Sequence, residues 1–217
     1  MKTEYIKRYL FFLVGLFVMS IGVAFSIKAD LGTSPISSVP CVLSLTVPIS
    51  VGQLTIAMHC LFVLLQIVIL RKKYQLIQLM QIPVAIVFGM MIDFSVYLLR
   101  NLQYSSYFVQ WIFCLIGIIL VAVGVSMEVT ANVVTLAGEG LVLAICKVLP
   151  VKFSNMKMCF DCVLVVIAAL ISILMKGELL GIREGTIAAA VFVGLLSKPI
   201  CLPMTKWMNQ WISVKEK

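Results

Sequence analysis

Eight stretches of apolar residues follow one another along the chain, separated by short segments that contain polar residues, glycine or proline. A helix needs about 20 apolar residues to cross a bilayer. Most of the stretches approach that length, but the second and the sixth are short and contain helix breakers. The eight stretches lie at residues 9–27, 31–48, 53–70, 79–99, 108–127, 133–149, 158–175 and 186–204.

The second and sixth stretches are built unlike the others. The second begins with Leu-Gly-Thr-Ser-Pro at residues 31–35, continues through Pro40 and ends at Pro48. The sixth carries Gly-Glu-Gly at residues 138–140 and ends at Pro150. Proline removes a backbone donor and glycine weakens a helix, so we expect two broken or re-entrant helices.

An internal repeat relates the two halves of the chain. A shift of 102 positions aligns pairs of identical or related residues without a gap, and three further residues bring Gly89 onto Gly194. We interpret residues 1–107 and 108–217 as two membrane repeats of four helical segments each, together forming one integral membrane domain. The aligned pairs include Gly15 with Gly117, Gly22 with Gly124, Asp30 with Asn132, Thr33 with Thr135 and Pro48 with Pro150.

The basic residues favour one topology. If the two interrupted segments return to the side from which they entered, only Lys28, Arg100, Lys176 and Arg183 lie outside, which leaves 13 of the 17 Lys and Arg in the cytoplasm. This topology has six spans, two re-entrant segments and both termini in the cytoplasm. Its halves are inverted, as in many secondary transporters. Eight full spans in two parallel halves, with six basic residues outside, remain the alternative.

The composition fits a bilayer rather than water. Hydrophobic residues make up 62% of the 217 positions and charged residues 12%, against about 45–50% and about 25% in soluble domains. The net charge of +8 comes from basic residues at the ends of apolar runs, so we expect lipid and not nucleic acid as its partner. We predict a multi-pass protein in which the first stretch is a membrane helix rather than a cleaved signal.

The interrupted segments are the leading candidates for a site. Lipid offers no hydrogen bonds, so broken backbone must line a cavity or be buried in protein. Amide groups freed at the start of a short helix suit an anion or a carboxylate. The alternative is that the prolines only kink a helix and the hydroxyls satisfy its own carbonyls. The substrate-binding residues that we predict are Asp30, Thr33, Ser34, Ser37, Asn132, Thr135 and Glu139.

Acidic residues within the apolar stretches could couple transport to protons or sodium. Asp93 lies well inside the fourth stretch, and Glu139 lies between two glycines that allow close backbone approach. We predict that these two residues couple the ion. A structural partner for Asp93 and a turn anchor for Glu139 are the alternatives.

Enzyme chemistry is not supported by the sequence. A single histidine, His59, excludes a catalytic histidine pair or a multi-histidine metal site, and no glycine-rich phosphate loop is present. Cys159 and Cys162 have the spacing of a redox pair but lack a second pair, and we interpret them as small apolar helix residues. We therefore predict no catalytic residue, no metal and no cofactor.

Two segments resemble a known family. Residues 22–35 read GVAFSIKADLGTSP, and residues 181–186 read GIREGT before Val193 and Gly194. Together they resemble the bacterial YczE/YitT-type membrane proteins over nearly the whole chain. The resemblance implies a bacterial inner-membrane protein with a poorly defined activity, and it transfers no substrate-binding residue.

Two functions remain open. The first is a secondary transporter or permease for a small solute of unknown identity, with its site between two inverted halves. The second is a non-transporting scaffold or regulatory component of a partner complex. A homo-oligomer is compatible with either. A third reading, a membrane enzyme that acts through Cys159 and Cys162, would require their thiols.

Overall fold

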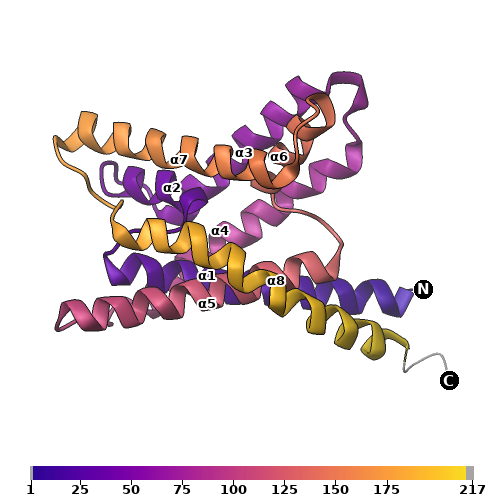
Figure 1. Ribbon diagram of the computed structural model, residues 1–217, viewed down its shortest axis with the longest axis horizontal. Helices are drawn as coiled ribbons and strands as arrows, with labels where there is room; N and C mark the ends of the chain where they lie inside the picture. The colour runs from indigo at the N-terminus through magenta and orange to yellow at the C-terminus, as the bar shows by residue number, and fades with distance from the viewer. Residues whose placement is uncertain (1, 214–217) are drawn as a thin grey trace.

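The computed structural model describes residues 2–213, in which every regular element is a helix (Figure 1). Two shorter helices, α2 (Pro35–Ser44) and α6 (Ala137–Val148), follow the first and the fifth helix. The all-α polytopic bundle predicted from the sequence is confirmed. Six helices in the described part of the chain are long and apolar enough to cross a membrane: α1 (Lys2–Ala29), α3 (Val51–Leu70), α4 (Gln81–Leu98), α5 (Tyr107–Ala131), α7 (Phe153–Lys176) and α8 (Glu184–Ser213).

The lengths of α2 and α6 decide between six and eight spans. They contain 10 and 12 residues, which at 1.5 Å per residue gives about 15 and 18 Å. The hydrocarbon core of a bilayer is about 30 Å thick. Neither helix can cross it, so the eight-span alternative does not fit the structure.

The outward faces of the long helices are apolar. Val68, Met90, Phe94 and Leu174 are all more than half exposed on the isolated chain. Such side chains would be unfavourable in water, and on a bundle of long apolar helices they form the surface that contacts lipid tails.

The most extensive helix contact joins α1 to α5. Gly15 faces Gly124 and Gly22 faces Gly117, because a Cβ atom built on any one of them would lie within 3.3 Å of the carbonyl oxygen of its partner. The order of these contacts requires antiparallel helices. A shift of 102 residues carries Gly15 onto Gly117 and Gly22 onto Gly124, so it exchanges one glycine pair with the other. A two-fold axis perpendicular to the helices produces this pattern.

The two groups of four helices interlock. The short helix α2 packs against α7, and the short helix α6 packs against α3 (Figure 1). Helix α2 therefore contacts α7 of the second half more extensively than α3 of its own half, and α6 contacts α3 of the first half more extensively than α7. This exchange supports the prediction of one membrane domain rather than two separable ones.

Hydrogen bonds between helix ends define two faces of the bundle. At the first, which we call the termini face, the Lys7 ammonium binds the carbonyl of Trp211 and Arg8 binds the carbonyl of Ala131. At the second, the Asp30 face, Lys28 binds the carbonyl of Arg100 at 3.0 Å.

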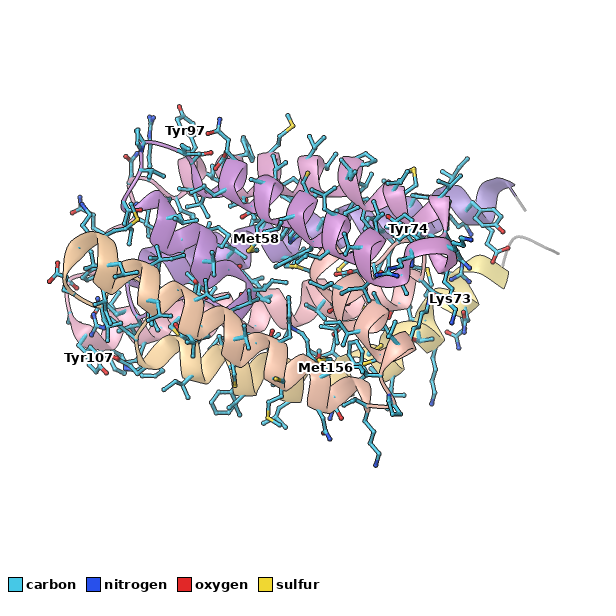
Figure 2. All side chains as sticks on the ribbon, turned by 90° about the horizontal axis from the view of Figure 1, so that it is seen from above. Met58, Lys73, Tyr74, Tyr97, Tyr107 and Met156 are labelled. Atoms are coloured by element: carbon cyan, nitrogen blue, oxygen red, sulfur yellow. The ribbon has the colours of Figure 1, made fainter. Side chains whose placement is uncertain are left out.

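The connecting segments lie at these two faces. Tyr97 and Tyr107 lie at one end of the bundle, and Lys73 and Tyr74 lie at the other (Figure 2). Two 3-10 turns, Arg71–Lys73 and Leu76–Met80, join α3 to α4 at the termini face.

Both short helices return to the face where they began. The segment before α2 follows Asp30, and α3 begins beside Asp93 near the Asp30-face end of α4. In the second half α5 ends beside Arg8 at the termini face, and α8 begins at the Asp30 face, where the Arg183 side chain binds the carbonyl of Asp30. Since α7 joins α8 through only seven residues, 177–183, α6 enters and leaves at the termini face. The two halves therefore run in opposite directions.

Candidate functional site

The two interruptions have the same backbone conformation. Helix α1 ends before Asp30, with a φ of 54°, and α5 ends before Asn132, with a φ of 50°. Ser34 and Leu136, the residues before α2 and α6, have φ and ψ values that agree to within 1°. A left-handed residue followed by extended backbone reverses the chain direction, so the sequence prediction of broken helices is met at both places.

A cavity of about 270 Å³ lies at the start of α6, and we call it the α6 pocket. Its walls come from both halves of the chain: the Leu76–Met80 turn and α4 on one side, and the α5–α6 connection on the other. It therefore lies between the halves at the termini face, beside the broken segment of the second half. Its lining residues are Ile77, Gln78, Gln81, Glu128, Val129, Asn132, Val133, Val134, Thr135 and Glu139.

Glu128 is the most deeply buried acid in the pocket, with 2% of its surface exposed. One carboxylate oxygen accepts the backbone N–H of Leu136 at 2.8 Å and so binds the first amide of the α6 segment. The second oxygen, Oε2, is buried and has no hydrogen-bond partner among the described residues. An unpartnered buried carboxylate oxygen is costly, by about 1–3 kcal/mol or more, and this makes Glu128 a candidate for binding a ligand.

The buried amide of Gln81 lines the pocket and is hydrogen-bonded to a second buried amide, that of Gln66. The Gln66 amide donates to the Gln81 side chain at 2.8 Å and to the carbonyl of Ala137 at 3.1 Å, while its own side-chain oxygen lacks a partner among the described residues. A Cβ atom at Gly140 would lie 2.6 Å from the Gln81 amide. Glycine at this position is what allows both amides to approach α6, which agrees with the expectation of close backbone approach beside Glu139.

Three of the predicted substrate-binding residues meet here. Asn132 and Thr135 lie at the exposed mouth of the α6 pocket, and Glu139 lies further in, on the first turn of α6. Glu139 lies close enough to Glu128 and to an ion pair on α7 to interact with them electrostatically. In that ion pair the Lys157 Nζ is 2.5 Å from the Asp161 Oδ1.

The other four predicted residues lie at the opposite face. Thr33 is buried and its hydroxyl has no partner among the described residues, while the Ser34 hydroxyl donates to the Ser37 hydroxyl at 3.1 Å. Asp30 is exposed and accepts a hydrogen bond from Tyr104 at 3.2 Å. None of the four lines the α6 pocket. The structure therefore separates the predicted residues into two groups, one beside each short helix.

Asp93 has a structural partner. Its carboxylate accepts the Ser50 hydroxyl at 2.6 Å and the backbone N–H of Gly52 at 2.8 Å, at the start of α3. A carboxylate at a helix N-terminus satisfies free amides and complements the helix dipole. Asp93 therefore holds α3 to α4, and its ion-coupling role stays a prediction.

The sequence did not predict Glu128 as part of the pocket, or Gln66 as the partner of the lining residue Gln81. Both are polar residues inside apolar helices of spanning length, and that rarity was the available signal. His59 is a third such residue: it is 1% exposed, stacks on Phe88 and has an unpartnered Nδ1 among the described residues. It does not line the α6 pocket. Cys159 and Cys162, which the sequence analysis considered as a redox pair, are both exposed on α7.

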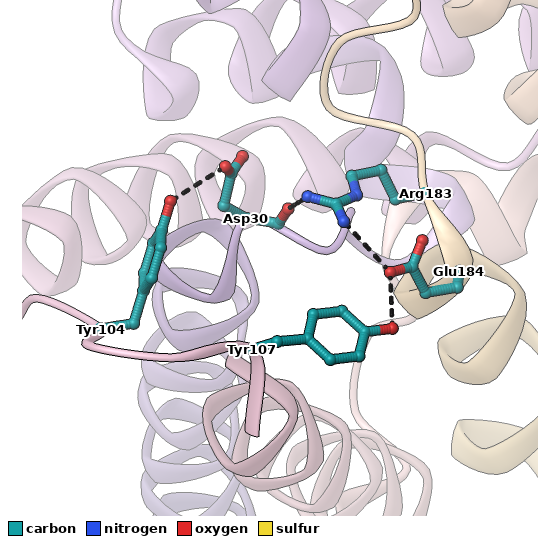
Figure 3. A network of polar contacts seen from close by, with 5 residues as sticks. All are labelled: Asp30, Tyr104, Tyr107, Arg183 and Glu184. Carbon is teal, nitrogen blue, oxygen red and sulfur yellow. Dashed lines mark hydrogen bonds and ion pairs between the residues drawn. The ribbon is translucent and has the colours of Figure 1, made fainter. Parts of the chain in front are cut away.

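A chain of polar contacts closes the Asp30 face (Figure 3). Arg183 donates to the carbonyl of Asp30 at 3.0 Å and to Glu184 at 3.2 Å, and the Tyr107 hydroxyl donates to Glu184 at 3.0 Å. Tyr104 completes the chain at Asp30, whose negative charge raises the pKa of the Tyr104 phenol. This Asp30-face network ties the end of α1 to the starts of α5 and α8.

Gly32 fixes the Asp30 turn beneath this network. Its φ of 94° is unfavourable for any residue with a side chain, and a Cβ atom there would collide with the Thr186 hydroxyl of α8. The Thr186 hydroxyl is buried without a hydrogen-bond partner among the described residues.

Comparison with known proteins gives a family but no activity. No solved structure matches the chain. The chain is 25% identical over 121 residues to the uncharacterized protein YyaS of Bacillus subtilis (strain 168), a match that covers 55% of this chain and 59% of YyaS. The family model of unknown function DUF6198 matches residues 6–201. The chain therefore belongs to the DUF6198 family, a family of unknown function.

Proposed function

We propose that this protein is a secondary transporter for a small solute, and that the solute binds in the α6 pocket between the two halves. The observation that carries the proposal is the pocket itself, a cavity of about 270 Å³ at a broken helix that contains an unpartnered, buried carboxylate oxygen. Broken helices that point polar backbone at a central cavity are a recurrent way of building transporter sites.

The two faces of the bundle support alternating access. At the termini face the pocket is reached past the exposed residues Asn132 and Thr135. At the Asp30 face the equivalent segment is held by the Asp30-face network and contributes no wall to the pocket. In the opposite state, α6 would close over the pocket and α2 would open.

The charge distribution supports a cytoplasmic termini face in a bacterial inner membrane. The Arg71–Lys73 turn joins α3 to α4 at this face, where Lys7 and Arg8 also lie. Basic residues of short loops favour the cytoplasm. The resemblance of residues 22–35 to the YczE/YitT-type proteins supports the same location. With the termini face in the cytoplasm, the mouth of the α6 pocket opens to the cytoplasm in this structure.

Reconstitution of the full chain in liposomes tests the proposal. Uptake is measured for a panel of labelled amines, amino acids, carboxylates, sugars and nucleosides. We expect one class to enter above the level of empty liposomes. Thr135→Trp, which fills the mouth of the pocket from an exposed position, should reduce that uptake at least tenfold. Val148→Trp, an equally large change on the exposed end of α6, should not. Uptake of no class, or equal loss in both variants, would contradict transport through this pocket.

One observation favours the second candidate function, a scaffold that binds a partner in the membrane. An apolar groove of about 530 Å³ lies on the outer surface between α1 and α8, where Pro199 and Pro203 interrupt the hydrogen bonding of α8. Trp207 forms one wall of the groove. Extraction in a mild detergent distinguishes the two functions, because a scaffold should retain a partner that Trp207→Ala releases. The groove is lined by Phe11, Pro199, Ile200, Pro203, Met204 and Trp207.

A further inference from the structure

We infer that the solute of the α6 pocket is a small organic cation, a protonated amine with a compact apolar body. This inference rests on the proposed function and adds the chemical class of the ligand. It starts from the unpartnered Oε2 of Glu128, an acceptor that is buried in the wall of the pocket.

The ionisable side chains that line the pocket are acids. Glu128 and Glu139 both line it, and no lysine or arginine does. Two basic groups near the pocket are paired: Lys157 binds Asp161 at 2.5 Å, and Arg8 binds Glu4 and the carbonyl of Ala131. A ligand that brings a positive charge would therefore meet two acidic side chains in the lining and no lysine or arginine there.

The helix dipole does not reverse this conclusion. The N-terminus of α6 carries a partial charge of roughly +0.5, and from the sequence alone it suited an anion. In the structure Glu128 already accepts the N–H of Leu136, and Glu139 lies in the first turn of α6. Acidic side chains of the chain itself therefore occupy the helix N-terminus that would have bound an anion, so the expectation of an anionic ligand is replaced by that of a cation.

The size and walls of the pocket favour an organic ligand over a bare metal ion. An engineered cavity of about 150 Å³ holds benzene, and the α6 pocket measures about 270 Å³. Calcium needs a cage of six to eight oxygens, whereas four lining residues are the aliphatic Ile77, Val129, Val133 and Val134. An ammonium group can donate to Glu128 while a ring-sized body lies against these side chains.

Three probes of one shape test the inference on the purified full chain. Benzylammonium, benzyl alcohol and benzoate differ in charge and share a ring, and their dissociation constants are measured by calorimetry in detergent. We expect benzylammonium alone to bind. We expect Glu128→Gln to weaken it at least tenfold, because glutamine keeps the acceptor for Leu136 but loses the charge. The control Glu178→Gln removes an exposed acid far from the pocket and should leave the constant unchanged.

The outcomes separate the inference from the transport proposal. Tighter binding of benzoate or benzyl alcohol, equal weakening by Glu178→Gln, or binding of none of the three probes would overturn the organic cation. Competition by sodium or potassium chloride at the same concentration as the amine would assign an inorganic ion and overturn it as well. If benzylammonium binds through Glu128 but reconstituted liposomes do not take it up, the site stands and transport fails. Uptake of another solute class without amine binding would leave transport standing and refute the amine.

Discussion

Replacement of Gly22 by alanine should destabilise the bundle, because this glycine lies where α1 and α5 are closest. An added Cβ atom would lie 2.7 Å from the Val121 nitrogen and 2.9 Å from the Gly117 oxygen. Ordinary contacts of a Cβ atom begin near 3.4 Å, so the two helices must separate locally by about 0.7 Å, the difference between 3.4 and 2.7 Å. Both atoms belong to the backbone of α5, so no side chain can rotate away to relieve the contact.

The size of the effect follows from a matched control. Overpacking of this kind costs about 1–3 kcal/mol, but alanine also favours a helix over glycine by up to about 1 kcal/mol. Gly194→Ala on α8 has the same helix propensity change, and its Cβ atom would meet no other atom within 4 Å. The difference between the two variants therefore isolates the contact, and we expect Gly22→Ala to be the less stable by about 1–3 kcal/mol.

Unfolding in mixed micelles with increasing sodium dodecyl sulfate measures this difference. Tryptophan fluorescence follows the transition, and the two variants are compared with the natural chain under the same conditions. If their free energies of unfolding differ by less than about 0.5 kcal/mol, the usual range for surface substitutions, the close approach of α1 and α5 is refuted. The same result would remove the evidence for the two-fold relation between them.

Three further predictions concern the faces of the bundle. In a chain without native cysteines, an impermeant maleimide should label Lys72→Cys from the cytoplasm and Arg100→Cys from the opposite side; labelling of both from one side would refute the topology. Asp30→Asn should lower the pKa of Tyr104 towards its ordinary value, because the carboxylate disfavours the phenolate; an unchanged titration of ¹³C-labelled tyrosine would contradict this. Arg183→Gln should speed amide exchange in residues 178–186, measured by mass spectrometry, yet change unfolding by less than about 1 kcal/mol, since its contacts are exposed; unaltered exchange would exclude a gating network.

Much of the architecture could be predicted because local sequence determines it. Apolar length sets which helices can span a bilayer, and glycine and proline set where they stop. Equivalent helices begin 102 residues apart in the structure. Helix α2 begins at Pro35 and α6 at Ala137, and α3 begins at Val51 and α7 at Phe153. The duplication stays an interpretation, and these equivalent boundaries support it.

The packing of the fourth helices could not be predicted from that register. Gly89 and Gly194 align in sequence, but Gly89 approaches Gly52 of α3 closely, whereas Gly194 faces open space. Helix α4 packs against α3, whereas α8 packs mainly against α5 and not against α7, so Gly194 does not meet Ser154, the residue of α7 that corresponds to Gly52. An alignment carries residue types to equivalent positions, and the tertiary contact depends on what both partners offer.

The composition of the site was also beyond the sequence. Asp30 and Glu139 both lie at broken helices, yet the inverted halves put them at opposite faces. Which side of α5 faces the pocket depends on the crossing with α1, so the burial of Glu128 follows only from the assembled bundle. A hydrophobic run that ends in an acid does not reveal whether that acid points to water or to protein.

The two interpreted repeats differ at one pair of positions that matters for the proposed site. The equivalent of Glu128 in the first half is Ser26, whose hydroxyl binds the carbonyl of Gly22 within its own helix at 3.1 Å. Glutamate is long enough to leave its helix and reach the N–H of Leu136, so of this pair only Glu128 places a carboxyl group in the wall of a pocket. Because the glycine contacts hold α1 against α5, we expect these two helices to stay fixed while α6 moves with α3 and α2 moves with α7. A carboxylate on the fixed helix can then hold one solute while either short helix opens.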